Sequence, residues 1–129
     1  MARVAIFEDD EVRQKWFQYD EDTEVLISYI GRQDLQKINN KASKAGKLTG
    51  TAHTDYFNCL VGRKAVKGWR KAKDHDHPGL IVKYQPFPYT QENLDLLMTR
   101  SLEFSRFVND RCTDAELFDL EDEAEIKND

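Results

Sequence analysis

The sequence lacks any long hydrophobic run. No stretch of its 129 residues approaches the roughly 18 consecutive apolar residues that a membrane-spanning helix needs. The apolar run at residues 4–7 is too short for the hydrophobic part of a secretory signal, and four acids follow it. We therefore expect a protein that is neither membrane-inserted nor exported, with a single globular domain over residues 1–120.

Cysteine is scarce as well. The two cysteines, Cys59 and Cys112, lie within apolar patterns typical of helices. Cysteines in such a setting behave as small apolar side chains and are more often buried thiols than disulfide partners. The sequence thus predicts two free thiols and a cytoplasmic protein.

Signatures of catalysis are also missing. The chain has no Gly-x-Ser-x-Gly motif, no glycine-rich phosphate loop and no helix with paired zinc-binding histidines. Cys59 is expected on the buried side of a helix, beside Leu60, where the reactive thiolate form is disfavoured. We expect no catalytic residue, no cofactor and no enzymatic activity.

One run of residues has the composition of a metal site. Residues 74–77 read Asp-His-Asp-His and could hold a divalent metal, with His53 as a third nitrogen ligand. The same residues are also typical of a solvated turn, since a Pro-Gly pair follows them. Nothing in the sequence predicts neighbours that would hold the ligands in place. We therefore expect no native metal.

The net charge of −5 conceals strong segregation of charge along the chain. Residues 1–30 carry a net charge of −5, residues 31–73 carry +9, residues 74–112 carry −2 and residues 113–129 carry −7. A basic middle between acidic ends can pair with complementary partners or with other copies of the chain, including head to tail.

The N-terminal half predicts a hairpin followed by a helix. Residues 24–30 are β-branched and aromatic and predict a strand, paired antiparallel with the aromatic segment before an acidic turn at residues 20–22. Residues 34–45 have helical composition with a thin apolar stripe. The overlapping run 41–51 is small, basic and punctuated by glycine, and predicts a mobile loop.

The C-terminal half predicts two longer helices. The first begins after Thr54, a good N-cap, and closes on residues 66–70. A charged loop and a strand-like run at residues 80–84 follow. Thr90 is the expected cap of the second helix, over residues 91–111, which is the most apolar element of the chain.

The end of the chain is acidic. A short helix is predicted over residues 114–120, and residues 121–129 are too acidic to pack, which predicts a flexible, disordered tail. The fold class that results is α+β, a predominantly helical small domain with a short N-terminal antiparallel sheet and this flexible acidic C-terminal tail.

Basic residues crowd the predicted helix end around residues 63–73, and three interpretations stay open. The residues are a solvated helix face, they bind an acidic protein segment, or they contact phosphates while Trp69 stacks on a base. Trp69 and Trp16 are more typical of anchors at the edge of a core. The nucleic-acid interpretation would use Arg63, Lys64, Lys67, Trp69, Arg70, Lys71 and Lys73.

Three short motifs point to a family. In chain order they are the strand at residues 25–29 with Leu-Gln-Lys-Ile at 35–38, Val-Lys-Gly-Trp-Arg at 66–70, and Pro-Tyr-Thr-Gln-Glu-Asn-Leu at 88–94. This combination, over residues 24–118, resembles the tail assembly chaperones of long-tailed bacteriophages and prophages. Many members of that family show a helix that ends in a Val-x-x-Trp-Lys/Arg-Gly-like segment, then a variable loop and a Pro-Phe/Tyr-Thr/Ser-x-Glu-Asn helix start. Lys71 departs from the pattern, since glycine often stands there, and residues 74–79 replace the usual Asp-Gly turn.

The resemblance implies a non-enzymatic protein of the host cytoplasm that is needed to build the phage tail and is absent from the finished particle. Family members are thought to coat the tape measure protein, to keep its apolar helices soluble and to bring tail tube subunits to it. Exposed apolar contacts backed by charge suit such a role. The apolar contacts are expected around residues 97–107 and in the acidic C-terminal segment. The expected partner-binding residues are Arg63, Lys64, Lys67, Trp69, Arg70, Leu117 and Phe118.

Overall fold

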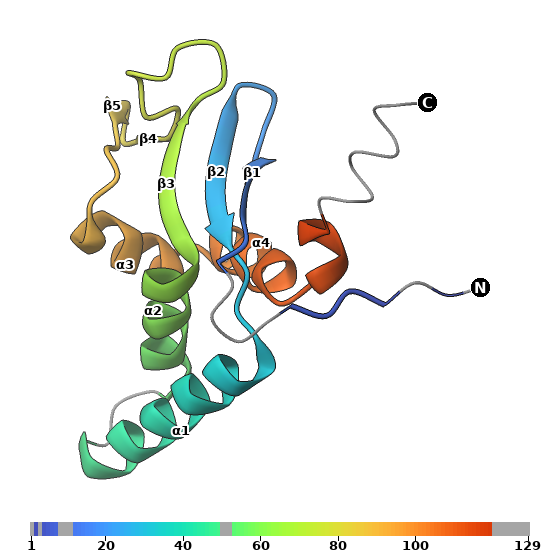
Figure 1. Ribbon diagram of the computed structural model, residues 1–129. Coiled ribbons are helices and arrows are strands. Elements are labelled where there is room, and N and C mark those ends of the chain that lie inside the picture. Colours follow the sequence, from blue (N-terminus) through green and yellow to red (C-terminus); the bar gives the residue numbers. More distant parts are fainter. Residues whose placement is uncertain (1, 3, 8–11, 50–52, 120–129) are drawn as a thin grey trace.

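The computed structural model describes residues 2, 4–7, 12–49 and 53–119, and helices outweigh strands in this part of the chain (Figure 1). The predicted α+β class with a short antiparallel sheet is confirmed. None of the helices in the described residues is long and apolar enough to cross a membrane. The elements in chain order are β1 (Gln14–Gln18), β2 (Thr23–Ser28), α1 (Arg32–Thr49), α2 (His53–Ala65), β3 (Val66–Lys71), β4 (Ile81–Val82), β5 (Gln85–Pro86), α3 (Gln91–Arg100), α4 (Leu102–Cys112) and the 3₁₀ helix η1 (Ala115–Phe118).

The predicted N-terminal hairpin is confirmed. β1 pairs antiparallel with β2, and Phe17 stands opposite Val25 on the inner face of the sheet. The acidic turn closes the hairpin because the side chain of Asp20 accepts hydrogen bonds from the backbone N–H groups of Asp22 and Thr23, at 2.9 and 2.7 Å. Short Asp side chains stabilise turns in this way.

The predicted end of the first long helix is wrong, because residues 66–71 form a strand. The helix stops at Ala65, and β3 follows at once and pairs antiparallel with β2. The register shifts between Leu26 and Ile27, so that Lys67 is the extra residue of a β-bulge. The bulge lets both Val66 and Trp69 face the core while Lys67 stays exposed.

Residues 41–49, predicted as a mobile loop, form the second half of α1 instead. Most of the residues there are good helix formers, and Ala42 is fully buried. The rest of the predicted loop, residues 50 and 51, lies outside the described residues. α2 begins at His53, so Thr54 lies in the first turn and is not the residue before the helix.

The long helix predicted over residues 91–111 is two helices that meet at Ser101. The backbone of Ser101 is extended, and its side chain accepts a hydrogen bond from the N–H of Phe104 at the start of α4. The predicted cap at Thr90 is confirmed, because its hydroxyl accepts a hydrogen bond from Asn93 N–H at 3.0 Å. Ser and Thr accept such bonds well and stabilise helix starts.

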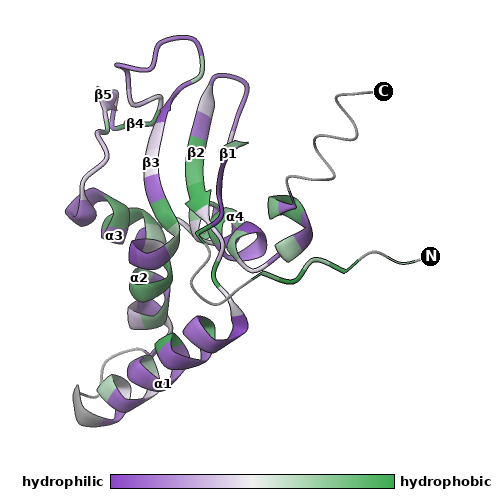
Figure 2. Cartoon of the chain, viewed as in Figure 1, coloured by the Kyte–Doolittle hydropathy of each residue, from purple (hydrophilic) through white to green (hydrophobic). Residues whose placement is uncertain are grey.

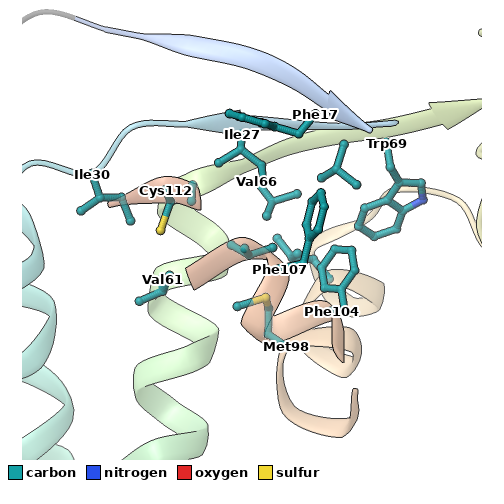
Figure 3. Close-up of a cluster of buried hydrophobic side chains, with 14 of the residues drawn as sticks. Phe17, Ile27, Ile30, Val61, Val66, Trp69, Met98, Phe104, Phe107 and Cys112 are labelled. Carbon is teal, nitrogen blue, oxygen red and sulfur yellow. The ribbon is translucent and has the colours of Figure 1, made fainter. Parts of the chain in front are cut away.

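The core lies between the inner face of the β1–β2–β3 sheet and the helices (Figure 3). Ile27 and Val66 of the sheet meet Phe104 and Phe107 of α4, and Val61 of α2 closes one side. α2 and α3 approach closely at Gly62, where an added Cβ would lie only 2.5 Å from Met98 Cγ. The sheet, α2, α3 and α4 therefore form one packed unit.

Smaller elements complete the described chain. The predicted strand-like run at residues 80–84 forms only a two-residue strand, and its hairpin turn holds Lys83 and Tyr84 at positive φ. The short helix predicted over residues 114–120 is the 3₁₀ helix η1. The predicted flexible tail, residues 121–129, lies outside the described residues.

Candidate functional site

A groove between α1 and α2 is the candidate functional site. Among the described elements, α1 packs extensively only against α2. It projects from the rest of the molecule and is called the α1 arm below (Figure 1). The groove has a volume of about 350 Å³. Its lining comes from both helices, with Lys37, Ile38 and Lys41 from α1 and Leu60, Arg63 and Lys64 from α2.

Helical spacing places these side chains in the groove. The apolar stripe of α1 consists of Leu35, Ile38 and Ala42, three and four residues apart, and α1 packs against α2. Lys37 and Lys41 lie one turn apart on the flank of that stripe. Figure 2 shows that α1 is mostly hydrophilic elsewhere. The result is an apolar floor with a cationic rim.

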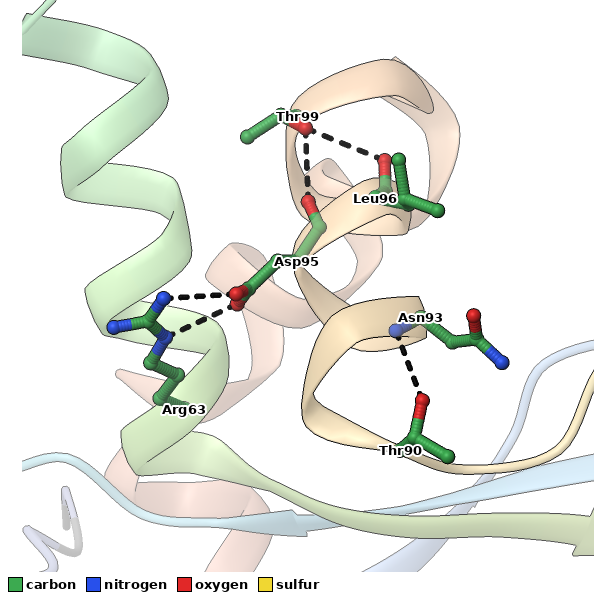
Figure 4. A network of polar contacts seen from close by, with 6 residues as sticks. All are labelled: Arg63, Thr90, Asn93, Asp95, Leu96 and Thr99. Atoms are coloured by element: carbon green, nitrogen blue, oxygen red, sulfur yellow. Dashed lines mark hydrogen bonds and ion pairs between the residues drawn. The ribbon is translucent and has the colours of Figure 1, made fainter.

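The rim on α2 is fixed by an ion pair. The guanidinium of Arg63 donates two hydrogen bonds to the carboxylate of Asp95 on α3, at 3.1 and 2.8 Å (Figure 4). The bond to Asp95 is the main cause that raises the pKa of Arg63. A bidentate pair of this kind holds the side chain in one orientation. The side chain of Arg63 therefore lines the groove in a fixed orientation.

The helix that carries Asp95 is itself well anchored. Thr90 caps its first turn, and the hydroxyl of Thr99 donates a hydrogen bond to the carbonyl of Asp95 at 2.8 Å (Figure 4). The buried side chains Leu94 and Met98 attach α3 to the core. The position of Arg63 is thus tied to the core and does not depend on the α1 arm.

The two lysines of α1 differ from the cations of α2. The ammonium nitrogen Nζ of Lys64 lies 3.8 Å from Oδ2 of Asp34, within ion-pair distance. Within the described part of the chain, neither Lys37 nor Lys41 has an ion pair or a side-chain hydrogen bond. α1 carries five bases and only one acid, Asp34. Among the described residues, the positive charge of Lys37 and Lys41 is therefore not balanced by carboxylates.

Trp69 is not available to a partner. Its side chain is 5% exposed, and its indole N–H donates a hydrogen bond to the carbonyl of Phe87 at 2.7 Å. The rings of Tyr89 and Phe104 contact it edge to face. The prediction that Trp69 lies on a binding surface is therefore wrong, and the interpretation of Trp69 as a core anchor is correct.

The remaining predicted basic residues do not share one helix face. Arg70 lies on β3, where it donates a hydrogen bond to Glu24 at 2.6 Å and stacks over the ring of Trp16 at 3.7 Å. Lys67 is exposed at the bulge of the same strand. Only Arg63 and Lys64, of the predicted partner-binding residues, line the groove.

The two apolar residues predicted in the C-terminal segment separate in the structure. Phe118 is 1% exposed and packs against the rings of Phe17 and Tyr29, so its predicted role as an exposed contact is wrong. Leu117 is 37% exposed. Adjacent residues of a 3₁₀ turn point in different directions, and only one of them can face the core.

Hydrogen bonds form within the acidic, histidine-rich loop at residues 74–79. Nδ1 of His77 accepts a hydrogen bond from Gly79 N–H at 2.9 Å, and Asp74 accepts one from the backbone of Asp76. His53 lies at the start of α2, 3.2 Å from the hydroxyl of Ser43. Within the described residues, no three His, Cys, Asp or Glu side chains are grouped to hold a metal ion.

Both cysteines are free, as predicted. Cys112 is fully buried, and burial raises the pKa of its thiol to about 12. Cys59 is partly buried, and burial again is the main cause that raises its pKa, with the charge of Asp95 second. Neither thiol is activated as a nucleophile.

The residues that sequence reasoning missed are Lys37, Ile38 and Lys41. The sequence does not single them out as site residues because the apolar stripe of this segment is thin and because the glycine and small residues after residue 40 predict a loop. The spacing of Lys37, Lys41 and Lys44, four and three residues apart, was the signal that could have found them, since it places the three on one side of a helix.

Together, these features define a small α+β protein with an open groove between α1 and α2. The base of the groove is apolar, and basic side chains surround it. No family model matches the chain, and comparison with curated proteins and with solved structures finds no similar protein.

Proposed function

We propose that this chain is a non-enzymatic assembly chaperone of a bacteriophage or prophage tail. In this role it acts in the host cytoplasm and binds the tape measure protein and the tail tube protein while the tail is built. The observation that carries the proposal is the groove between α1 and α2, which is open, apolar at its floor and basic at its rim.

The physical requirements of such a chaperone favour this groove. A protein that holds apolar helices must offer apolar contacts without aggregating, and charges around a small apolar floor meet both needs. Ile38 and Leu60 give the floor, and four cations surround it. α1 has extensive contact only with α2 among the described elements, and the groove between these two helices is open, so a client can reach it.

The sequence motifs support the proposal independently of the groove. The Pro-Tyr-Thr-Gln-Glu-Asn motif stands at the start of a helix, as in the family, and Thr90 caps that helix. The Val-Lys-Gly-Trp-Arg motif differs, because it forms β3 and does not end a helix. The family resemblance therefore rests on the order of the motifs more than on the local structure of the second one.

Nucleic-acid binding is the second candidate, favoured by the five bases of α1. Its predicted stacking residue, Trp69, is buried, and the six groove-lining residues include no aromatic side chain. We expect no band shift with single-stranded or duplex DNA at physiological salt. A shift that weakens steeply as salt increases would instead favour this second function.

Co-expression tests the proposed function. The tagged chain is expressed with the tail tube and tape measure proteins of the same phage or prophage genome, purified by its tag and analysed by size-exclusion chromatography. We expect the tape measure protein to be soluble and to co-elute with the chain. A matched culture without the chain is the control. If both tail proteins are absent from the purified chain, the proposal is abandoned.

A further inference from the structure

We infer that the groove between α1 and α2 binds an acidic amphipathic helix of the client protein. The inference deepens the proposed function, on which it rests, by naming the chemistry of the bound segment. Its basis is charge complementarity, because Lys37 and Lys41 form a positive rim with no ion-pair partner in the described residues.

The spacing of the lysines matches the spacing of acids on a helix. Lys37 and Lys41 are four residues apart, which corresponds to about 6 Å along a helix at a rise of about 1.5 Å per residue. Carboxylates four residues apart on a partner helix repeat at the same distance. Lys44 continues this side of α1 by one further turn. A partner helix that lies along α1 can therefore pair with two or three lysines in register.

The floor of the groove requires an apolar face on the same partner. Ile38 and Leu60 are half-buried, and the groove volume of about 350 Å³ is at the low end of the roughly 300–1,000 Å³ of ligand pockets. That volume accommodates apolar side chains from one turn of a helix, while the helix itself lies above the groove. An acidic segment without an apolar face would leave the floor exposed to water.

The fixed and the unpaired cations have different roles in this arrangement. Arg63 is already paired with Asp95, and Lys64 lies near Asp34. These two residues shape the wall on α2. Within the described residues Lys37 and Lys41 have no carboxylate partner, so the carboxylates of a bound helix can pair with them, and these two lysines therefore determine the preference for an acidic helix.

The probe is a synthetic helical peptide of about 18 residues with leucine at positions i, i+3, i+4 and i+7 and glutamate on the flanks. A second peptide has lysine in place of every glutamate. Binding is measured by fluorescence anisotropy to the full chain. We expect the acidic peptide to bind at least about tenfold more tightly than the basic one, since opposite charges attract and like charges repel at the rim.

Variants of the chain locate the binding surface. Lys37→Glu with Lys41→Glu is expected to weaken binding of the acidic peptide at least about tenfold, and Lys37→Gln with Lys41→Gln by an intermediate factor. Lys83→Glu with Arg106→Glu makes the same change of charge outside the groove and is expected to leave binding unchanged. Thermal melting checks that each variant is folded.

The outcomes separate the inference from the function on which it rests. No binding of the acidic peptide, or equal binding by wild type and the Lys37→Glu, Lys41→Glu variant, overturns the inference. Tighter binding of a DNA oligonucleotide than of the acidic peptide, with loss in the same variant, also overturns it. A chain that binds the acidic peptide in the groove but recovers no tail protein on co-expression keeps the inference and loses the proposed function.

Discussion

Gly79 is the residue on which the loop between β3 and β4 depends most directly. Its φ of +80° is in the left-handed region that favours glycine. An added Cβ would lie 2.8 Å from the side chain of Thr23 and 3.0 Å from the backbone of Arg70. Thr23 is buried and donates a hydrogen bond to the carbonyl of Gly79, so it has little room to move.

Gly79→Ala is therefore predicted to lower the free energy of unfolding by about 1–3 kcal/mol, measured by urea denaturation. Gly68→Ala is the matched control, because an added Cβ there meets Trp16 at an ordinary distance of 3.8 Å. The control should change stability by less than about 0.5 kcal/mol. Equal effects of the two substitutions would contradict this account of the loop.

Cys112 gives a prediction about pH. The buried thiol has its pKa raised to about 12 from an ordinary value of 9.0, so the unfolded chain releases this proton at lower pH than the folded chain does. Between pH 9 and 12 the unfolded state binds fewer protons, and stability falls as pH rises. The loss should reach about 1 kcal/mol per pH unit in this range.

The measurement compares urea denaturation of wild type and Cys112→Ala at pH 7, 9 and 10. Tyr19 and Tyr89 also have pKa values raised by burial, but they are present in both proteins. The steeper decline of the wild type above pH 9 therefore reports Cys112. Parallel curves over the whole range would show that the thiol is not buried in solution.

Single residues show where sequence reasoning succeeds. The interpretation of Trp69 as a core anchor is correct because it depends on the residue type and on the apolar segment beside it, and not on knowing the distant rings of Tyr89 and Phe104. The prediction that Phe118 is exposed is wrong because its partners, Phe17 and Tyr29, are about a hundred residues away in the sequence. Acidic composition around Phe118 gave no sign of that distant contact.

At the scale of elements, one hydroxyl caps the start of α4 at its junction with α3. The side chain of Ser101 accepts a hydrogen bond from Phe104 N–H at 3.1 Å. Ser101→Ala is predicted to lower the free energy of unfolding by about 1 kcal/mol because the first turn of α4 loses its cap. Ser101→Asp keeps an acceptor at this position and should stay within about 0.5 kcal/mol of wild type. Urea denaturation measures both, and equal losses would exclude a capping role.

Elements also show why sequence patterns mislead. The stretch from α2 into β3 contains no proline, and its apolar spacing fits a helix as far as Ala65. Pairing with β2 then overrides any helical continuation at Val66, since β3 gains a ladder of backbone hydrogen bonds and buries Trp69. Local pattern cannot foresee this because the partner strand is some forty residues earlier.

The same limit applies to α1. Its thin apolar stripe is enough for a helix only because α2 packs along it, and that contact is invisible in the segment itself. The hairpin of β1 and β2 and the cap at Thr90 were predictable because their determinants are local. The groove was not predictable, because it requires both helices and their relative placement.

At the scale of the whole molecule, the basic middle of the sequence is divided between two surfaces. Part lies on the α1 and α2 helices around the groove, and part lies on β3, where Arg70 is paired with Glu24 and stacked on Trp16. The charge total of +9 for residues 31–73 therefore overstates what any one partner meets. Lys37 and Lys41, which have no ion pair within the described part of the chain, carry the part of this charge that a partner can use.

This division predicts the salt dependence of binding. An increase from about 50 to about 500 mM NaCl should weaken binding of the acidic helical peptide several-fold, because exposed charges are screened within a Debye length. Binding should persist at high salt, since contacts with Ile38 and Leu60 are apolar. The measurement is fluorescence anisotropy across the salt series. Affinity that is independent of salt would exclude a role for the lysines.

The most direct test of the account is affinity purification of the tagged chain from its native cells with phage production induced, analysed by mass spectrometry. The wild type is compared with Lys37→Glu, Lys41→Glu. We predict that the wild type recovers tail tube or tape measure protein and that the variant, although folded, does not. Recovery of nucleic acid or unrelated proteins with no tail component, or equal recovery of tail proteins by both chains, would contradict the account.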